Sequence, residues 1–339
     1  MVFPWREKGI VLTAPLTEEV DDVVKFIEEY LAPRGFNMVV LQVRYRYQFK
    51  RHPEVWGYDP LSEADVKKLL SACCRNNIKL VPKMNLIGHQ SGFPNEPTDG
   101  ILHGHNEVTA DIRDGLLRAY PEFDEQYGEK EIDYARSICL SSRAARTVVY
   151  ELIEELMEVF ESDTIHIGCD EVFNIGKCSV CSKKTNGELL ADWVNGINVF
   201  IKKRGGTVLM WGDRLLPLEE TGYDRWEAAE NGTGTAIDTL SRDVVICDWH
   251  YNNYKEYKSV DLLGRCGFKM MVSPWRDKDS LEAFVSYAKE HDKGHINGVL
   301  MTTWCASGDL AKRLLYGTDG RWVHTEQIAN TIDSIFTIE

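Results

Sequence analysis

The chain has 339 residues, a formal net charge of −14 and a hydrophobic fraction of 43%. This balance is that of an ordinary globular protein, and the length suits either two medium domains or one large α/β barrel. The excess of acidic residues argues against a nucleic acid or an anionic membrane surface as a partner. No apolar run approaches the roughly 20 residues that a membrane-spanning helix needs.

The first residues, MVFPWREKGIVL, lack the basic stretch, apolar stretch and cleavage site of a secretory leader. Nine cysteines are an odd number and too few for a disulfide scaffold in a chain of this length. We therefore expect a cytoplasmic protein whose cysteines are reduced and mostly buried.

Eight nearly continuous apolar runs predict strands that are buried on both faces of a parallel sheet. These runs are residues 9–14, 37–43, 78–84, 164–168, 207–211, 243–249, 268–273 and 298–304.

Segments with a helical period lie between the runs, at 17–31, 61–74, 141–160, 187–206, 279–292 and 325–336. Thr17 is the expected N-cap of the first helix, and Ser62 with Asp65 forms a near capping box in the second. Gly205 and Gly206 are expected to end the fourth helix.

Eight strands alternating with helices predict a (β/α)8 TIM barrel that forms one domain over residues 1–339. An open doubly wound sheet is the alternative. The longest connection, residues 85–138, follows the third strand, and a loop of that length is usually functional or contains short helices of its own.

Polar and aromatic residues follow the strands, at the end of a barrel where catalytic residues lie. They are His89, Asp170, Glu171, Trp211, Asp213, Asp248, Trp249, Tyr251, Trp275, Arg276, Trp304 and Asp309. Aromatic faces with carboxylates between them are typical of a sugar-binding site, where rings stack on the sugar and acids bind its hydroxyls. The alternative is that the tryptophans cover the barrel core.

Asp170 and Glu171 are adjacent at the end of the fourth predicted strand. Successive residues point in different directions, so one acid can protonate a leaving oxygen while its neighbour contacts another part of the substrate. Alternatively, the pair is a helix N-cap followed by a first-turn glutamate.

The stretch HIGCDEV, residues 166–172, resembles the His-x-Gly-x-Asp-Glu motif of glycoside hydrolase family 20, the β-N-acetylhexosaminidases. RGFNMVVLQV, IKLVPKMNLIGH, LMWGD, DWHY and GVLMTTW resemble further strands of that family. The resemblance is closest to its hexosaminidase D branch, because HIGCDEV and RCGF at 265–268 are shared with it.

The resemblance implies a substrate-assisted mechanism, in which the 2-acetamido oxygen of the sugar attacks the anomeric carbon to give an oxazolinium intermediate. Glu171 would then be the general acid/base, and Asp170 would orient the acetamido group. Tyr251 would hydrogen-bond the acetamido oxygen, and His89 would lie behind the acid pair.

The same resemblance implies that Trp304 forms the floor of the sugar pocket and that Trp211 and Trp249 form its walls. Trp275 is a further candidate sugar contact at a strand end.

Two positions depart from the family pattern. The first strand ends LTAP without the arginine that many members carry, and Ala306 stands where many have an acid, with Asp309 nearby. Arg44, Asp213 and Arg276 are therefore the candidate hydroxyl contacts, and the choice between GlcNAc and GalNAc stays open.

Cys178 and Cys181 have the spacing of half a zinc knuckle. No second pair of that spacing exists, although Cys73, Cys74 and the two histidines at 103 and 105 could be considered. We expect a reduced pair or an adventitious disulfide, with a closed structural zinc as the less favoured alternative. No metal and no cofactor are expected, because the mechanism implied by the family needs none.

These features together predict a retaining exo-β-N-acetylhexosaminidase acting on terminal β-linked GlcNAc or GalNAc of a small molecule or oligosaccharide. One alternative is a non-catalytic carbohydrate-binding barrel. Another is a metal-dependent hydrolase that uses His89, His103 and His105.

Overall fold

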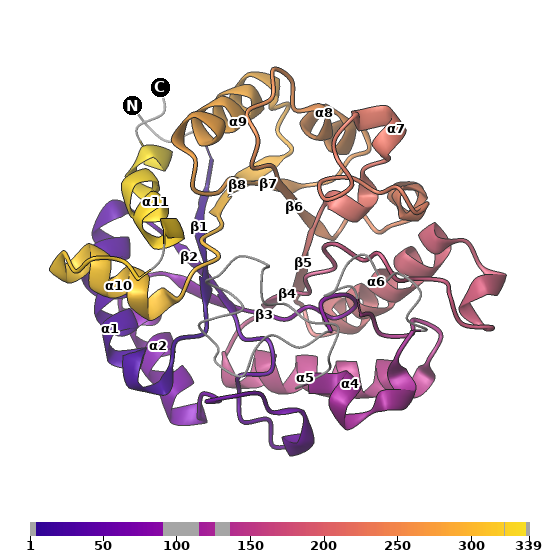
Figure 1. Ribbon diagram of the computed structural model, residues 1–339, viewed down its shortest axis with the longest axis horizontal. Helices are drawn as coiled ribbons and strands as arrows, with labels where there is room; N and C mark the ends of the chain where they lie inside the picture. Colours follow the sequence, from indigo (N-terminus) through magenta and orange to yellow (C-terminus); the bar gives the residue numbers. More distant parts are fainter. Residues whose placement is uncertain (1–4, 91–114, 126–135, 322, 337–339) are drawn as a thin grey trace.

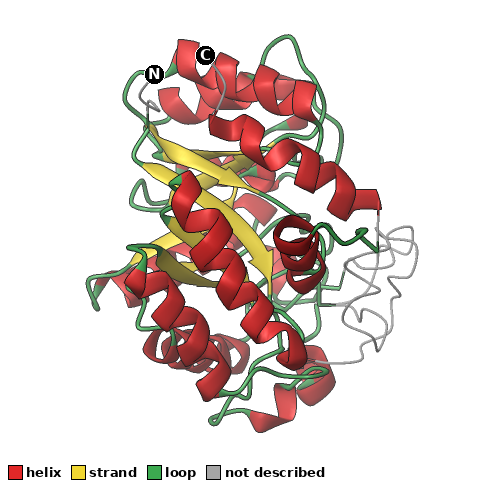
Figure 2. Cartoon of the chain, turned by 90° about the vertical axis from the view of Figure 1, so that its left-hand side faces the viewer, coloured by secondary structure: helices red, strands yellow, loops and turns green. Residues whose placement is uncertain are grey.

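Eight parallel strands close into a barrel in chain order, with helices around it (Figures 1 and 2). The computed structural model describes residues 5–90, 115–125, 136–321 and 323–336. The strands are β1 Glu7–Thr13, β2 Met38–Gln42, β3 Lys79–Lys83, β4 Thr164–His166, β5 Thr207–Trp211, β6 Val245–Trp249, β7 Met270–Ser273 and β8 Ile296–Met301.

Because β1 pairs with both β2 and β8, the sheet has no edge within this ring. The predicted TIM barrel is confirmed, and the open doubly wound sheet is wrong.

The α-helices are α1 Val20–Lys25, α2 Glu63–Arg75, α4 Gly115–Ala119, α5 Arg143–Val159, α6 Asn186–Lys202, α7 Leu218–Thr221, α8 Lys258–Arg265, α9 Lys278–His291, α10 Ser307–Tyr316 and α11 Val323–Thr331. All six predicted helices are present. The sequence interpretation missed α7, α8 and α10, and α4 is a short helix inside the long connection after β3.

The predicted helix caps have mixed outcomes. The capping box of Ser62 and Asp65 is confirmed, with both reciprocal hydrogen bonds at the start of α2. The expectation for Thr17 is wrong, because its hydroxyl donates to Asp59 across a gap in sequence instead of capping its own helix. Gly205 has a left-handed φ of 75°, but α6 already ends at Lys202.

The side chains inside the barrel change from apolar to polar along the strands. Val11, Val40 and Val81 lie in register on β1, β2 and β3 and belong to the apolar interior cluster. Two residues further along, where the side chains point to the same face, stand Thr13, Gln42 and Lys83, again in register. A polar layer therefore forms the bottom of the site at the carboxyl ends of the strands.

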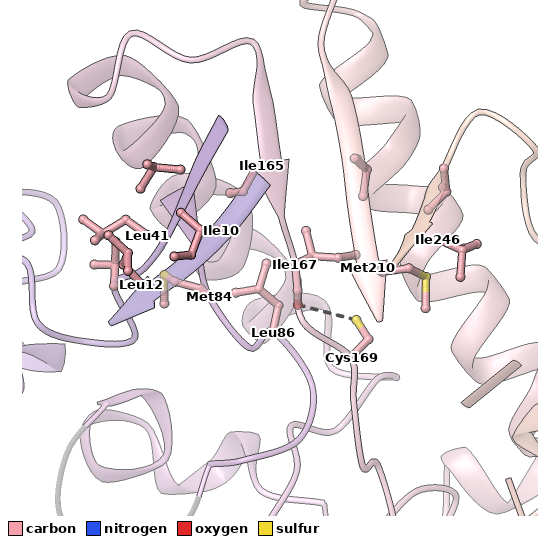
Figure 3. Packing of buried hydrophobic residues seen from close by; sticks show 14 of the residues in the cluster. Ile10, Leu12, Leu41, Met84, Leu86, Ile165, Ile167, Cys169, Met210 and Ile246 are labelled. Carbon is pink, nitrogen blue, oxygen red and sulfur yellow. Dashed lines mark hydrogen bonds between the residues drawn. The ribbon is translucent and has the colours of Figure 1, made fainter. Parts of the chain in front are cut away.

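The opposite face of the strands packs against the surrounding helices. Figure 3 shows part of this layer, in which Ile10, Leu12, Leu41, Ile165, Ile167, Met210 and Ile246 are buried. Within the described parts of the chain, no helix has the length and apolar character required to cross a membrane.

Candidate active site

The motif at the end of β4 places one residue in the core and the next two in the site. The Cys169 thiol is fully buried and points at the carbonyl oxygen of Ile167, 3.6 Å away (Figure 3). Asp170 and Glu171 follow, and both reach His89 on the loop after β3. No helix starts at Asp170, because the next helical turn begins at Cys181, so the helix-cap interpretation of the acid pair is wrong.

Two glycines let the loops after β3 and β4 approach each other. Gly168 has a φ of 69°, and a β-carbon there would lie 2.2 Å from Oδ1 of Asn85. A β-carbon on Gly88 would lie 3.2 Å from the carbonyl oxygen of Asp170. The close contact brings His89 beside the acids.

His89 is shared by the two carboxylates. Its Nε2 lies 3.1 Å from Oδ2 of Asp170 and 3.3 Å from Oε2 of Glu171, and the three side chains are only 12–14% exposed. Burial alone would lower the pKa of His89, but the Asp170 charge and the hydrogen bonds to both acids outweigh it and raise the pKa to about 10. His89 is therefore a cation at neutral pH.

Asp170 is correspondingly held in its ionised form. Burial works to raise its pKa, but the charge and hydrogen bond of His89, with the charge of Lys83, hold the pKa well below its usual value. Oδ1 of Asp170 is buried and accepts no hydrogen bond from the residues that the structure describes.

Asp213, predicted as a sugar contact, supports the acid pair through hydrogen bonds. Its Oδ2 accepts the backbone N–H of Glu171 at 2.9 Å and the Arg214 guanidinium at 2.7 Å. Its Oδ1 accepts the indole N–H of Trp249 at 3.1 Å, and the residue is only 2% exposed. Burial raises the pKa of Asp213 to about 6, although Arg214 opposes this.

Five aromatic residues from the strand ends form a continuous group. The ring centroids of Trp211 and Trp304 are 5.8 Å apart, and Tyr251 lies 4.8 Å from both Trp249 and Trp275. Trp211 and Trp249 are buried over the apolar barrel interior, whereas the other three are partly exposed. Trp211 and Trp249 thus cover the core, as the alternative interpretation expected, and sugar contact by the aromatic group stays a prediction.

Tyr251 and Trp304 are joined by a hydrogen bond in which the indole N–H donates to the phenol oxygen at 2.6 Å. Burial raises the pKa of Tyr251 well above its ordinary value. The phenol therefore keeps its proton and can donate it to a further acceptor.

A buried ionic network behind Tyr251 was missed by the sequence interpretation. Glu227 accepts the backbone N–H of Tyr251 at 3.3 Å and lies 2.5 Å from Nδ1 of His250. Nε2 of His250 lies 3.2 Å from Oδ1 of Asp248 and 2.8 Å from the hydroxyl of Ser259. Burial would lower the pKa of His250, but Asp248 and Glu227 raise it to about 9. Glu227 lies between β5 and β6 in the stretch DRWEAAE, which has no recognisable signal.

Lys83 at the end of β3 was also missed. It is buried, its Nζ donates to Gln42 at 2.8 Å and Asn85 at 2.9 Å, and it lies 5.6 and 5.5 Å from the ring centroids of Trp211 and Trp304. Burial lowers the pKa of Lys83 to about 8, with Asp170 opposing. The sequence could have revealed this residue, because a lysine two residues after Val81 stands at an inward-facing strand position where an apolar side chain is expected.

The backbone at the site adopts left-handed conformations that side chains rarely accept. The φ angles are 55° at His89, 72° at Cys169, 49° at Glu171 and 44° at Trp304. Such conformations persist only where surrounding contacts enforce them, as the Asp213 hydrogen bond does for Glu171.

The remaining candidate sugar contacts lie in different places. Arg276 stacks on Trp275 at 3.7 Å and lines a cavity of about 560 Å³ that also borders Tyr251. The Asp309 carboxylate accepts the Thr325 hydroxyl at 2.7 Å and is therefore a structural residue of α10. Arg44 follows β2 with a left-handed φ of 51°.

Cys178 and Cys181 lie together, as their spacing suggested, with the Cys181 N–H donating to Sγ of Cys178 at 3.3 Å. Their neighbours are Cys139 and Glu125, and not the Cys73–Cys74 pair. The two histidines at 103 and 105 lie outside the described residues.

The chain is similar in sequence to a known protein family and to one characterised protein. Residues 42–313 match the family described as glycosyl hydrolase family 20, catalytic domain. Lacto-N-biosidase of Bifidobacterium bifidum is 20% identical over 261 residues, which are 73% of this chain and 20% of that protein. The chain thus spans about a fifth of the length of that relative.

Solved structures share the fold at low sequence identity. A β-N-acetylhexosaminidase from Bacteroides fragilis matches with a TM-score of 0.66 and 14% identity, over 98% of this chain and 66% of that one. An exo-β-N-acetylglucosaminidase from Vibrio harveyi, solved with N-acetylglucosamine, matches with a TM-score of 0.64 and 14% identity, over 98% and 54%. Since the family match covers most of the chain and includes strands β3 to β8, this protein belongs to glycosyl hydrolase family 20.

Proposed function

We propose that this protein is a retaining β-N-acetylhexosaminidase that removes terminal β-linked GlcNAc or GalNAc by substrate-assisted catalysis. The observation that carries the proposal is the shared contact of His89 with Asp170 and Glu171. Asp170 and Glu171 are adjacent in the chain and contact the same imidazole nitrogen, which suits a division of roles in which one acid transfers protons and the other binds the acetamido group.

The substrate's own acetamido oxygen supplies the nucleophile in our proposal. Asp170 stays ionised beside His89, and its buried Oδ1 can accept the acetamido N–H. As the oxygen attacks the anomeric carbon, positive charge develops on the acetamido group, and the carboxylate stabilises it. The Tyr251 phenol donates to the acetamido oxygen and so aligns it for attack.

Glu171 performs the proton transfers. Its carboxyl protonates the leaving oxygen as the glycosidic bond breaks, and the resulting carboxylate then removes a proton from the water that opens the oxazolinium ring. The Asp213 hydrogen bond to its backbone N–H holds Glu171 in its left-handed conformation during both steps. The metal-dependent hydrolase would need His89 as a ligand. In the part of the chain that the structure describes, this histidine contacts both acids, which argues against a metal-dependent hydrolase.

The proposal is tested with four aryl glycosides: β-GlcNAc, β-GalNAc, β-glucoside and β-galactoside. Removing the acetamido group removes a reactant, and an intramolecular nucleophile can be worth about 7–11 kcal/mol of the barrier. We therefore expect turnover of one or both acetamido sugars and essentially none of the plain glycosides. A thiazoline analogue of the intermediate should inhibit strongly, because it resembles the species that the site stabilises.

Comparable rates on the plain glycosides, or no effect of the thiazoline, would contradict the substrate-assisted mechanism. Sugar binding without turnover of any of the four substrates would instead support the non-catalytic carbohydrate-binding barrel.

A further inference from the structure

Four potential metal ligands converge between the segment around residue 139 and the loop after β4. The thiols of Cys139, Cys178 and Cys181 and a carboxylate oxygen of Glu125 all lie within 4.8 Å of one another. Sγ of Cys139 lies 3.6 Å from both Cys178 and Cys181, and none of the three thiols forms a disulfide.

These separations fit a tetrahedral metal site. With Zn–S bonds of about 2.3 Å, two thiolates of a tetrahedron lie about 3.8 Å apart. A disulfide would require about 2.05 Å. The observed 3.6 Å is close to the tetrahedral value and far from the disulfide value.

The carboxylate of Glu125 is buried and is fixed in one orientation by backbone hydrogen bonds. It is 1% exposed, and its Oε1 accepts the backbone N–H groups of Lys177 at 2.5 Å and Cys178 at 2.7 Å. Its Oε2 is buried without a hydrogen-bond donor of standard geometry among the described residues, and the carboxylate interacts with the Cys139 thiol. A buried carboxylate oxygen that lacks a well-formed hydrogen bond is costly, and a cation would relieve that cost.

The cysteine pair has the supporting hydrogen bonds of a metal ligand. The backbone N–H of Cys181 donates to Sγ of Cys178 at 3.3 Å, which stabilises a thiolate. The Ser141 hydroxyl lies 3.1 Å from Sγ of Cys181 and can turn to donate once that sulfur is ionised. Such outer partners fix the orientation of metal ligands and tune their basicity.

We propose that Glu125, Cys139, Cys178 and Cys181 bind one structural zinc ion. Three thiolates and a carboxylate suit Zn²⁺, and four protein ligands leave no open position for chemistry. The sequence interpretation preferred a reduced pair because it required a second Cys-x-x-Cys. The structure supplies the other two donors separately, from both sides of the segment 126–135.

The ion would join the two loops that carry the acid pair and its histidine. The backbone N–H of Ile138 donates to Ile87 at 2.9 Å and that of Gln90 donates to Arg136 at 3.0 Å, so the segment ending at Cys139 binds the loop on both sides of His89. Cys178 lies on the loop that begins with Asp170. A metal that bridges Cys139 and Cys178 therefore stabilises the approach of these loops and acts as a positioning element.

The first test is elemental analysis of the full chain, purified from zinc-supplemented culture without chelators. We expect about one zinc per chain, and loss of that zinc in Cys139→Ser, in Cys181→Ser and in Glu125→Gln. Glu125→Gln is the sharpest variant, since an amide oxygen can still accept both backbone N–H groups while the carboxylate ligand is lost. Cys74→Ser, on the exposed side of α2, is the matched control and should keep its zinc.

The second test needs no variant and so does not depend on whether the variants fold. Wild-type protein should show a lower melting temperature after zinc is removed with a chelator, and zinc but not magnesium should restore it. Cobalt added to the stripped protein should give thiolate-to-cobalt charge-transfer absorption. Protein that carries no zinc, binds no cobalt and melts at the same temperature with and without chelator would overturn the proposal, as would a disulfide among these three cysteines.

Discussion

At the scale of single residues, the protonation of His89 controls the charge of Asp170. One cation shared by two carboxylates keeps Asp170 ionised even though the side chain is largely buried. The ion pair is a single interaction, so the raised pKa of His89 and the lowered pKa of Asp170 describe the same stabilisation from its two sides. Substitutions at this site should therefore alter the pH profile of activity more than the affinity for the substrate.

Glu171→Gln is expected to abolish most turnover of a disaccharide while sugar binding is largely kept. General acid catalysis contributes roughly 10²–10⁴-fold, and an activated aryl leaving group needs less of it. The measurement compares kcat for a chitobiose-type substrate with kcat for a dinitrophenyl glycoside. The acid assignment is wrong if disaccharide hydrolysis stays near the wild-type rate.

His89→Gln is expected to move the acidic limb of the kcat/KM profile to higher pH. Without the cation, burial remains the dominant influence on Asp170 and raises the pKa of its carboxyl. An acidic limb that does not move would show that His89 is not the counter-charge.

Stability should change with pH through the same pair. Because the folded pKa of His89 is raised from 6.5 to about 10, its stabilisation is complete below pH 6.5 and is lost as the pH rises toward 10. Melting temperatures of wild-type protein measured between pH 6.5 and 10 should therefore fall more steeply than those of His89→Gln. Parallel curves for the two proteins would contradict this account.

At the scale of elements, the site depends on how closely the loops after β3 and β4 approach. The apolar strands determine where these loops start, but the contact itself requires glycine at Gly168 and Gly88. The left-handed residues that follow are held by hydrogen bonds from other strands, such as the Asp213 contact from the end of β5. The chain stabilises strained conformations here with contacts that are distant in sequence.

Gly168→Ala and Gly205→Ala separate backbone strain from steric conflict. Both glycines have nearly equal φ angles, 69° and 75°, so both variants carry a left-handed alanine that costs about 1–2 kcal/mol. Only at Gly168 would the new β-carbon collide with Asn85, since the space around Gly205 is open. We expect Gly168→Ala to lose clearly more free energy of unfolding, measured with denaturant, and to lose activity as well. Equal losses in the two variants would show that the packing of Asn85 is not tight.

At the scale of the whole molecule, strand register brings distant residues into one layer. Thr13, Gln42 and Lys83 are far apart in sequence, but the parallel pairing places them side by side above the apolar interior. Ring closure between β1 and β8 then surrounds this layer with the aromatic strand ends. The site is therefore a property of the closed barrel and not of any one segment.

Thiol titration tests the burial pattern across the whole fold. Cys74 is exposed, while Cys73, Cys169, Cys181, Cys247 and Cys305 are buried. We expect a disulfide-exchange reagent to modify Cys74 first in the native protein, and to modify all nine cysteines after unfolding with a chelator present. Fewer than nine reactive thiols after unfolding would reveal a disulfide that the structure does not contain.

The sequence by itself determined the barrel and the position of its chemistry. A continuous apolar run indicates a strand that is buried on both faces, so β1 to β8 could be predicted from the local pattern. The acids and tryptophans that follow these strands marked the end of the barrel where the site is expected. Asp170, Glu171, His89 and Tyr251 were predicted as site residues in this way, and the structure brings the acids and His89 into contact. A local sequence pattern, however, does not show which residues from distant segments contact each other. The support that Asp213 gives to Glu171, the Glu227–His250 network and the ligand cluster of Glu125 with three cysteines all join residues from different segments. Only tertiary structure decides such pairings, because they depend on the register and closure of the strands and on the path of each loop.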